Sequence, residues 1–364
     1  MKYKTTIDYE GMIMIKVLLL LSMLFVPMFG GESNLNSDWT WLHRKNFSEN
    51  LRASNSNKKS LLFTQENVLP FTQLVFSWNA LRPEEGHFSF FVQVRDAVTK
   101  KWGSWHHMVD WGKDVQQSYV SKSDGFSSHI HVRLETDDKK GADAFRIKVE
   151  PHKSAALSLI HGMSAALSDF TRFNPQAPQS IDNSLQSVYL STIPSIAQFA
   201  LEHEDKSRIC SPVSCSMVVH YLTGKYKDPL EFAAGAFDTG LGVYGSWGCN
   251  MAHAFEQAEG KVNFFVRRMN SFGDVHHQLV QGVPVVVSIR GNLPGALKPF
   301  PHGHLMVIVG WDNDTREVLC HDPAAESHDG VFKRYPLDHF LRAWECSHRL
   351  SYIAEPVNCA VDKG

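Results

Sequence analysis

Short stretches rich in β-branched and aromatic residues follow one another through the first half of the chain. They lie at residues 71–79, 88–95, 127–135 and 144–150. Turn-forming residues separate them, as in Arg-Pro-Glu-Glu-Gly at 82–86 and Asp-Asp-Lys-Lys-Gly at 137–141. Several short strands with turn signals at near-regular spacing are typical of an antiparallel β-sandwich. We therefore expect an all-β sandwich over residues 61–168, with its last strand at 155–163.

Alternation of apolar and polar residues is clearest at residues 129–134, His-Ile-His-Val-Arg-Leu. Successive side chains of a strand point to opposite faces of the sheet. The pattern therefore predicts a single strand with Ile130, Val132 and Leu134 on one face and the polar side chains on the other.

The pattern changes after residue 168. Residues 169–187 are polar and contain two prolines, which is the composition of a linker. Residues 188–358 combine a helical pattern near 211–222 with the apolar runs Val-Pro-Val-Val-Val-Ser-Ile, Leu-Met-Val-Ile-Val-Gly-Trp and Glu-Val-Leu-Cys-His-Asp. A helix followed by packed strands predicts an α+β domain. The linker predicts that this domain and the sandwich are independent of one another.

The N-terminus has the pattern of a targeting signal. Lys16 is followed by the apolar run Val-Leu-Leu-Leu-Leu-Ser-Met-Leu-Phe-Val, which has about the length of a secretory signal. We expect residues 1–31 to be a signal peptide or an N-terminal anchor, with Met12 and Met14 as alternative starts, and residues 32–60 to be a polar segment. The protein is therefore expected to be exported to the periplasm, the cell envelope or the medium.

The composition narrows the class of protein. A chain of 364 residues is long enough for two domains. Its 43% of hydrophobic and 20% of charged residues are typical of a globular protein. The formal net charge of −2 leaves no basic surplus for phosphates, so nucleic acid is not an expected partner. Because the six cysteines form no Cys-x-x-Cys pair and no His-Glu-x-x-His sequence occurs, we expect no metal. We also expect no other cofactor and a monomeric protein.

A candidate nucleophile lies at the start of the predicted helix. Cys210 occurs in Ile-Cys-Ser-Pro-Val-Ser-Cys-Ser-Met-Val, where Pro212 suits the first helical turn and the apolar period begins just after it. The positive end of the helix dipole favours a thiolate there. Because a cysteine taken alone is more often a small buried apolar residue, the assignment depends on its partners.

Two downstream residues supply those partners. His304 directly precedes an apolar strand, and Asp322 lies at the end of the next strand. If the two strands are antiparallel neighbours, the start of one adjoins the end of the other and the carboxylate reaches the imidazole. A thiolate nucleophile needs an imidazole as base and acid and a third group to orient it. Upstream, the amide of Gln198 is a candidate donor to the oxyanion beside the N–H of Cys210.

Several motifs occur in order between residues 192 and 356. They are I-P-S-I-A-Q, I-C-S-P-V-S-C-S-M-V, Y-G-S-W-G-C-N, V-P-V-V-V-S-I, G-H-L-M-V-I-V-G-W-D and H-D-P-A-A. In these motifs the chain resembles the papain-like cysteine peptidases of family 39, which include the double-glycine-leader (bacteriocin-processing) peptidase domains, and more closely their secreted stand-alone members. The resemblance implies a papain-like fold with Cys210 as nucleophile, His304 as general base and acid, Asp322 as orienting group and Gln198 in the oxyanion hole.

Two positions depart from the pattern of that family. Ser211 follows the nucleophile where many members have Gly, and Val213 replaces a common Thr. Both positions adjoin the nucleophile, so they bear on the efficiency of the reaction rather than on its type.

Four residues compete for these roles. Cys215 lies inside the helix among apolar residues and is expected to be buried. His302 follows a proline in a predicted loop, and Asp312 follows Gly-Trp in a predicted turn. Asn250 either lines the cleft, as the resemblance implies, or forms a turn.

The chain is thus expected to be an exported thiol hydrolase that cleaves peptide or other amide bonds. Two alternatives stay open: a cell-wall amidase or acyltransferase with the same mechanism, and a catalytically idle protein that binds a cell-envelope partner or a glycan through the sandwich. Trp102, Trp105 and Trp111 either fill the sandwich core or form a stacking platform. Cys346 and Cys359 are the disulfide pair to test first.

Overall fold

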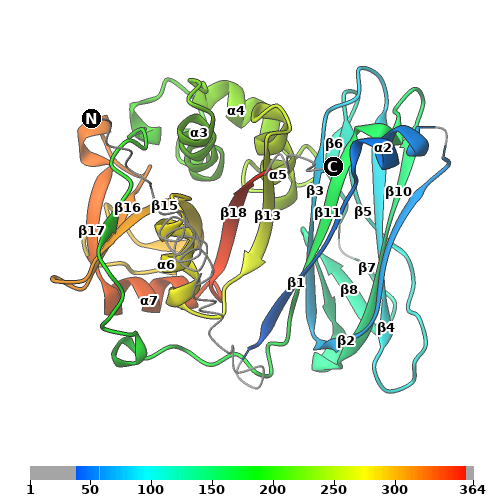
Figure 1. Ribbon diagram of the computed structural model, residues 1–364, viewed down its shortest axis with the longest axis horizontal. Helices are drawn as coiled ribbons and strands as arrows, with labels where there is room; N and C mark the ends of the chain where they lie inside the picture. Colours follow the sequence, from blue (N-terminus) through cyan, green and yellow to red (C-terminus); the bar gives the residue numbers. More distant parts are fainter. Residues whose placement is uncertain (1–37, 57, 121, 358–364) are drawn as a thin grey trace, which may run out of the picture. The chain divides into compact units, whose positions relative to one another are not determined.

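The computed structural model describes residues 38–56, 58–120 and 122–357 (Figure 1). The described residues from Trp39 onward form one compact unit. Residues 1–31 and Cys359, on which the targeting and disulfide predictions depend, lie outside the described ranges. Within those ranges, no helix has the length and apolar character needed to cross a membrane.

The first half is a β-sandwich of two antiparallel sheets. One sheet has the strand order β1-β11-β3-β9-β8-β7 and the other β2-β10-β4-β5-β6. The strands are β1 (Thr40–Asn46), β2 (Leu61–Phe71), β3 (Gln73–Ala80), β4 (His87–Asp96), β5 (His106–Gly112), β6 (Gln116–Ser118), β7 (Lys122–Ser123), β8 (Ser127–Ile130), β9 (Arg133–Thr136), β10 (Ala142–His152) and β11 (Ile160–Ser168). A short helix, α2 (Glu49–Asn55), and the 3-10 turns η1 (Asp137–Lys139) and η2 (Leu157–Leu159) connect them. The all-β prediction for this half is confirmed.

Aromatic side chains fill the sandwich core. The fully buried large residues are Phe63, Phe71, Trp78, Phe88, Phe90, Trp111 and Phe145. Trp111 is therefore a core residue, whereas Trp105 keeps 37% of its surface exposed. Trp102 lies beneath the guanidinium of Arg146, 3.8 Å from the ring centre. Of the three tryptophans, one belongs to the core and two lie on the outside of the sandwich.

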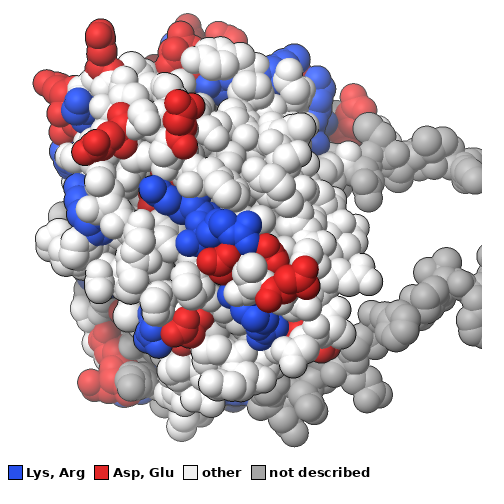
Figure 2. Space-filling model, turned by 90° about the vertical axis from the view of Figure 1, so that its left-hand side faces the viewer, with Lys and Arg blue, Asp and Glu red and all other residues white. Residues whose placement is uncertain are grey.

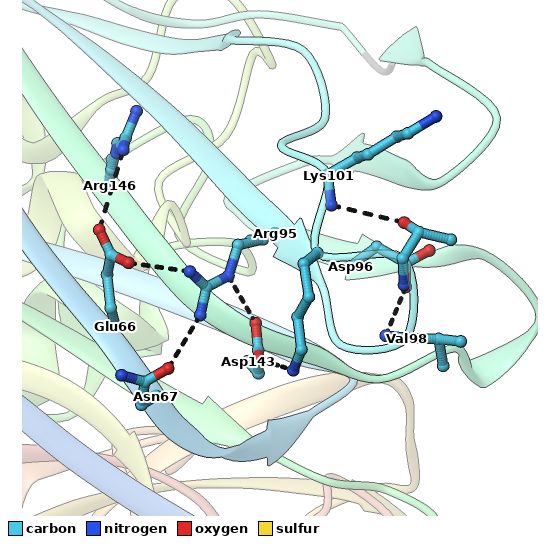
Figure 3. Close-up of polar contacts among 10 residues, drawn as sticks. Glu66, Asn67, Arg95, Asp96, Val98, Lys101, Asp143 and Arg146 are labelled. Atoms are coloured by element: carbon cyan, nitrogen blue, oxygen red, sulfur yellow. Dashed lines mark hydrogen bonds and ion pairs between the residues drawn. The ribbon is translucent and has the colours of Figure 1, made fainter.

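The outer surface of the second sheet carries a cross-strand ion-pair cluster. Arg95 of β4 donates from Nε to Asp143 of β10 at 2.8 Å and from Nη1 to Glu66 of β2 at 2.8 Å (Figure 3). Its Nη2 reaches Asn67, which has a positive φ of 57°. A single guanidinium thus joins three strands. Its pair with Asp143 is largely buried, whereas Glu66 is exposed, and exposed pairs contribute little to stability.

Two details of the sandwich differ from the sequence-based prediction. First, β1 lies within residues 32–60 and pairs with β11, so part of the expected polar segment belongs to the sandwich. Second, the alternating stretch 129–134 is not one strand. His131 has a positive φ of 54° and begins a two-residue turn between β8 and β9. Across this turn Ile130 pairs with Arg133, so the stretch forms a hairpin. As a result His129, not Ile130, is buried.

The second half is built around a seven-stranded sheet with helices on both faces (Figure 1). Its main strand order is β13-β18-β14-β15-β16-β17, and β12 also pairs with β15. The strands are β12 (Val188–Tyr189), β13 (Val262–Arg268), β14 (Val285–Gly291), β15 (Phe300–Asp312), β16 (Glu317–His321), β17 (Phe332–Pro336) and β18 (Leu350–Pro356). The helices are α3 (Cys210–Thr223), α4 (Pro229–Ala236), α5 (Trp247–Gln257), α6 (Phe272–Val280) and α7 (Leu337–Glu345), with 3-10 turns η3 (Pro178–Ser180), η4 (Gln198–Ala200) and η5 (His328–Gly330). The α+β prediction is confirmed.

Two apolar cores lie on opposite faces of this sheet. Residues of α3, α4 and α5 pack with Val286 and Val307 on one face. Residues of α6 and α7 pack with Val285 and Val287 on the other. Since adjacent residues of a strand point to opposite faces, the continuous apolar run of β14 serves both cores.

Charges on the surface are mixed in sign. On the face seen in Figure 2, Lys and Arg side chains lie interspersed with Asp and Glu between broad uncharged areas. Ion pairs also join surface charges of opposite sign: Arg334 pairs with Asp312 and, at 2.7 Å, with Glu317. This face presents no extended surface of one sign.

The residues expected to form a linker lie against the second half. Arg349 donates to the carbonyl of Asn174 at 2.9 Å, and the amide N–H of Gln176 donates to Glu345 at 2.6 Å. Ile181 is buried in the core that α6 and α7 form. The segment between the two halves is therefore anchored by specific contacts.

The two halves meet where β3 of the sandwich reaches β13, the edge strand of the other sheet. Along β3, Leu74, Phe76 and Trp78 face the sandwich core, whereas Gln73, Ser77 and Asn79 point away from it. Asn79 Oδ1 accepts from the N–H of Phe264 at 2.9 Å, and Ser77 Oγ accepts from the N–H of Val266 at 2.9 Å. The sandwich thus satisfies donors that an edge strand would otherwise leave unpaired.

Helix α5 strengthens this contact. Cys249 and Ala252 of α5 belong to the apolar core of the sandwich. Gly248 lies so close to Trp78 that an added Cβ would stand 2.6 Å from the indole ring. The two halves share a core and hydrogen bonds, so the independence expected from the linker is not what the structure shows.

We expect the change Asn79→Ala to lower the free energy of unfolding by about 1–3 kcal/mol, because it leaves the buried N–H of Phe264 without an acceptor. Urea denaturation of the full-length protein measures the loss. Asn263→Ala, on the same edge strand but only half-buried, is the matched control. Equal losses in the two variants would contradict the role of Asn79.

Candidate active site

Helix α3 carries Cys210 at its first position. The helix forms because residues 211–219 are all buried and pack between α4, α5 and the sheet, and it ends at Gly224, whose φ of 65° gives a left-handed cap. The first N–H groups of a helix lack intrahelical acceptors and carry a partial positive charge. Cys210, which keeps partial exposure, therefore lies where a thiolate is stabilised.

Two serines fix the start of this helix against the sheet. Ser214 Oγ donates to the carbonyl of Leu305 in β15 at 3.2 Å. Ser211 Oγ lies 3.1 Å from the hydroxyl of Tyr352 in β18. Ser211, which departs from the common Gly of the family pattern, is fully buried and anchors the helix that bears the thiol.

His304 and Asp322 come from adjacent antiparallel strands, as the sequence predicted. His304 lies in β15, and Asp322 directly follows β16, which pairs with β15 through Val307 and His321. Nε2 of His304 is 2.6 Å from Oδ1 of Asp322. Both side chains are buried, so the contact is shielded from water.

The thiol of Cys210 and the imidazole of His304, whose Nε2 contacts Asp322, act on each other's pKa. Burial works to lower the pKa of His304, but the charge and hydrogen bond of Asp322, aided by Cys210, raise it to about 10. Burial works to raise the pKa of Cys210, but the hydrogen bond and charge of His304 and the N–H of Leu305 lower it. The contacts therefore favour a thiolate beside an imidazolium.

Three further groups hold the carboxylate and the imidazole, and these roles were not predicted from the sequence. Tyr335 of β17 donates its hydroxyl to Oδ2 of Asp322 at 3.0 Å, and the N–H of Ala324 donates to Oδ1 at 2.9 Å. Although burial alone would raise the pKa of Asp322, His304 and these two donors lower it. Phe300 stacks on His304 with 4.0 Å between ring centres. The one feature of the sequence that could have indicated this stacking is that Phe300 lies four residues before His304 in the same strand.

Gln198 lies in η4 and is buried. Its backbone N–H donates to the carbonyl of Pro323, next to Asp322, at 2.8 Å. Its side-chain Nε2 donates to the carbonyl of Lys206 at 2.7 Å, and Oε1 has no partner among the described residues. An amide nitrogen carries two N–H groups, so one donor of Gln198 stays available.

The competing residues lie elsewhere. Cys215 is buried inside α3, and burial raises the pKa of its thiol far above the ordinary value. His302 is exposed, and Asp312 accepts from the N–H groups of Asp314 and Thr315 in a turn. Asn250 is neither in a turn nor exposed: it is buried in α5 and donates to two nearby carbonyls at 2.8 Å.

The structure thus brings His304 into contact with Asp322, and Cys210 and His304 shift each other's pKa. Among the described residues, no group of three or more His, Cys, Asp or Glu side chains is arranged to hold a metal ion. The chemistry that this set of groups can perform is nucleophilic attack by a thiolate with proton transfer through an imidazole.

Comparisons with known proteins show which proteins this half of the chain resembles. Residues 190–352 match the model of the Peptidase_C39 like family. No curated protein matches the chain. Among solved structures, a C39-like peptidase from Bacillus anthracis is 20% identical, with a TM-score of 0.34 over 46% of this chain and 97% of that one. Xylellain, a cysteine protease from Xylella fastidiosa, is 10% identical, with a TM-score of 0.31 over 51% of this chain and 91% of its own. By the family match, residues 190–352 belong to the C39-like peptidase family, and this half of the chain is a cysteine-type peptidase domain.

Proposed function

We propose that the second half hydrolyses peptide bonds with Cys210 as nucleophile, His304 as general acid and base, and Asp322 as orienting group. The observation that carries the proposal is the 2.6 Å contact between His304 and the buried Asp322 carboxylate, together with the effect of His304 in lowering the pKa of the Cys210 thiol at the start of α3. A buried carboxylate in contact with a histidine orients the imidazole and stabilises its protonated form, which is the role that a general acid and base requires.

The reaction begins with the thiolate. Sγ of Cys210 attacks the carbonyl carbon of the scissile bond, and the carbonyl oxygen takes up the negative charge. We assign the oxyanion to the N–H of Cys210 and to the free N–H of Gln198 Nε2. Because Lys206 holds the other N–H of that amide, the side chain of Gln198 is fixed before substrate arrives.

His304 then returns its proton. The imidazolium donates to the leaving amine, the C–N bond breaks, and a thioester to Cys210 stays behind. The neutral imidazole next takes a proton from water, whose oxygen attacks the thioester carbonyl. The carboxylic acid product leaves, and the proton stays on His304 beside the regenerated thiolate. Asp322 remains ionised throughout.

The same proposal includes export. The apolar run after Lys16 supports it, and that run lies outside the described residues.

The first test concerns the nucleophile. Cys210→Ala should abolish hydrolysis, and in the wild-type protein Cys210 should react with iodoacetamide at pH 6, where an ordinary thiol is almost fully protonated. Mass spectrometry of the labelled peptides measures the rate at each cysteine. Cys215→Ala, which removes a buried neighbour from the same helix, should keep this labelling. If Cys210 of the wild-type protein is not labelled at pH 6, the proposal is contradicted.

The second test concerns the proton carrier. Asp322→Asn should lower the pKa of His304 from about 10 by about 1–3 pH units, because the neutral amide removes the charge that holds the imidazolium. The histidine can then donate a proton only at lower pH, so hydrolysis loses its alkaline range. An NMR titration of 15N-labelled histidine measures the shift. Asp312→Asn, in an exposed turn, should leave the titration unchanged.

The third test concerns Tyr335 as a positioning residue. Tyr335→Phe keeps the ring but removes the hydrogen bond to Asp322, which should cost about 1.5–3 kcal/mol of stability at pH 7, as for a bond to a charged group. The pKa of His304 should move in the same direction as in Asp322→Asn, but less. Tyr189→Phe, at an exposed tyrosine, serves as control in both measurements. A stability loss with an unchanged His304 titration would make Tyr335 merely structural.

A further inference from the structure

A cavity of about 480 Å³ lies where the sandwich meets the peptidase sheet. Gln73, Arg133 and Glu135 line it from the sandwich, on the outward face of paired strands β3 and β9. Arg268, Arg290 and Ser288 line it from the peptidase sheet. Three arginine side chains but only one carboxylate, that of Glu135, thus line the cavity. The protein as a whole has a formal net charge of −2.

Arg268 is the central group of this cavity. It is only 5% exposed, yet no described carboxylate lies within ion-pair distance of it. Its Nε donates to Gln73 at 2.9 Å, and its Nη1 donates to the carbonyls of Ser347 and His348 at 2.7 and 2.9 Å. Nη2 makes no hydrogen bond to another described residue. The fixed side chain therefore presents a buried positive charge that no described carboxylate contacts directly.

The neighbouring charges increase the imbalance. Arg133 donates to Glu135 at 2.6 Å, so the one carboxylate of the cavity is already engaged. Burial lowers the pKa of Arg268 to about 9; the charge of Arg133 acts in the same direction, and the charge of Glu135 opposes it. Arg290 is exposed and makes no ion pair with a described carboxylate. A buried charge without a partner is costly, and an anion bound in the cavity would remove that cost.

The register of the sheet relates the cavity to the catalytic cysteine. Arg268 pairs with Leu350, the β14–β18 register continued by one residue places Ser288 beside Leu350, and Ser288 pairs with Leu305. Leu305 lies against the first turns of α3, since Ser214 Oγ donates to its carbonyl at 3.2 Å and its N–H acts to lower the pKa of the Cys210 thiol. Three strand spacings separate Arg268 from Leu305, about 14 Å. An extended peptide covers that distance with about four residues.

We propose that this cavity binds a carboxylate of the peptide substrate, about three to five residues from the scissile bond. The inference deepens the proposed function and rests on it, because a peptide is the ligand that joins the two places. Planar guanidinium groups suit carboxylates, since each presents paired N–H donors. The sandwich contributes Arg133 to this site and holds Arg268 through Gln73, so it takes part in choosing the substrate.

The first experiment measures binding without turnover. Full-length Cys210→Ala is titrated calorimetrically with N-acetyl-tetraglutamate amide, N-acetyl-tetraglutamine amide and N-acetyl-tetraglutamine with a free carboxyl end. The glutamate peptide should bind about tenfold more tightly than the neutral amide, in a salt-dependent manner. If only the free-acid glutamine peptide gains affinity, the bound group is a terminal carboxylate; if the glutamate amide gains, it is a side chain.

Variants then place the peptide in the cavity. Introducing both Arg133→Gln and Arg290→Gln into the Cys210→Ala protein should reduce binding of the preferred peptide about tenfold. Arg342→Gln, at an exposed arginine of α7, should not. Arg290→Gln alone, which removes an exposed side chain, decides the matter if the double variant does not fold. Equal binding of all three peptides, equal losses with Arg342→Gln, or inorganic phosphate competing as strongly as the peptide would overturn the proposal.

The second experiment uses cleavage by the wild-type protein. A denatured peptide mixture should be cut preferentially where Asp, Glu or a chain end lies three to five residues from the cut bond, and Arg290→Gln should lose that preference. Cleavage without any acidic preference would overturn the inference and leave the proposed function intact. Absence of cleavage, together with acidic peptide binding in the first experiment, would do the reverse.

Discussion

The buried carboxylate of Asp322 is the constraint on which the catalytic geometry depends. A carboxylate with no exposed surface must find hydrogen-bond donors, and it has three: His304, Tyr335 and the N–H of Ala324. They fix its orientation completely, so the imidazole can take only one position relative to α3. Breaking such a buried pair costs about 3–5 kcal/mol, which makes the arrangement a part of the fold as well as of the chemistry.

The sandwich is bound to the peptidase sheet through the same strand that closes one end of that sheet. β13 is an edge strand, and an exposed edge invites pairing with another chain. Here Ser77 and Asn79 satisfy its N–H groups, and Gln73 holds Arg268 at its end. Side chains on alternate positions of β3 therefore perform two tasks, since the intervening residues form the sandwich core.

The sequence allowed the proposed catalytic residues to be named because each lies at a recognisable boundary. Cys210 begins an apolar helix, His304 directly precedes the apolar run of β15, and Asp322 directly follows β16. Antiparallel pairing then requires the last two to meet. Tyr335 and Phe300 could not be named in this way, because their roles depend on which side chains the register places opposite them. The hairpin at His131 was missed because alternation persists through a two-residue turn.

The contact between the two halves was hidden for a related reason. The polar residues of β3 read as a solvent-facing side of a sheet, whereas all eight of its residues are buried. The same ambiguity applies to buried charge. Asp322 and Arg268 are both nearly inaccessible, but Asp322 has every partner within the chain, while Arg268 has carbonyl and amide partners and no counter-ion. One is a completed structural ion pair. The other is a charge held in place by its neighbours and left open toward a cavity, and that asymmetry separates a group that orients the catalytic base from one suited to receive a ligand.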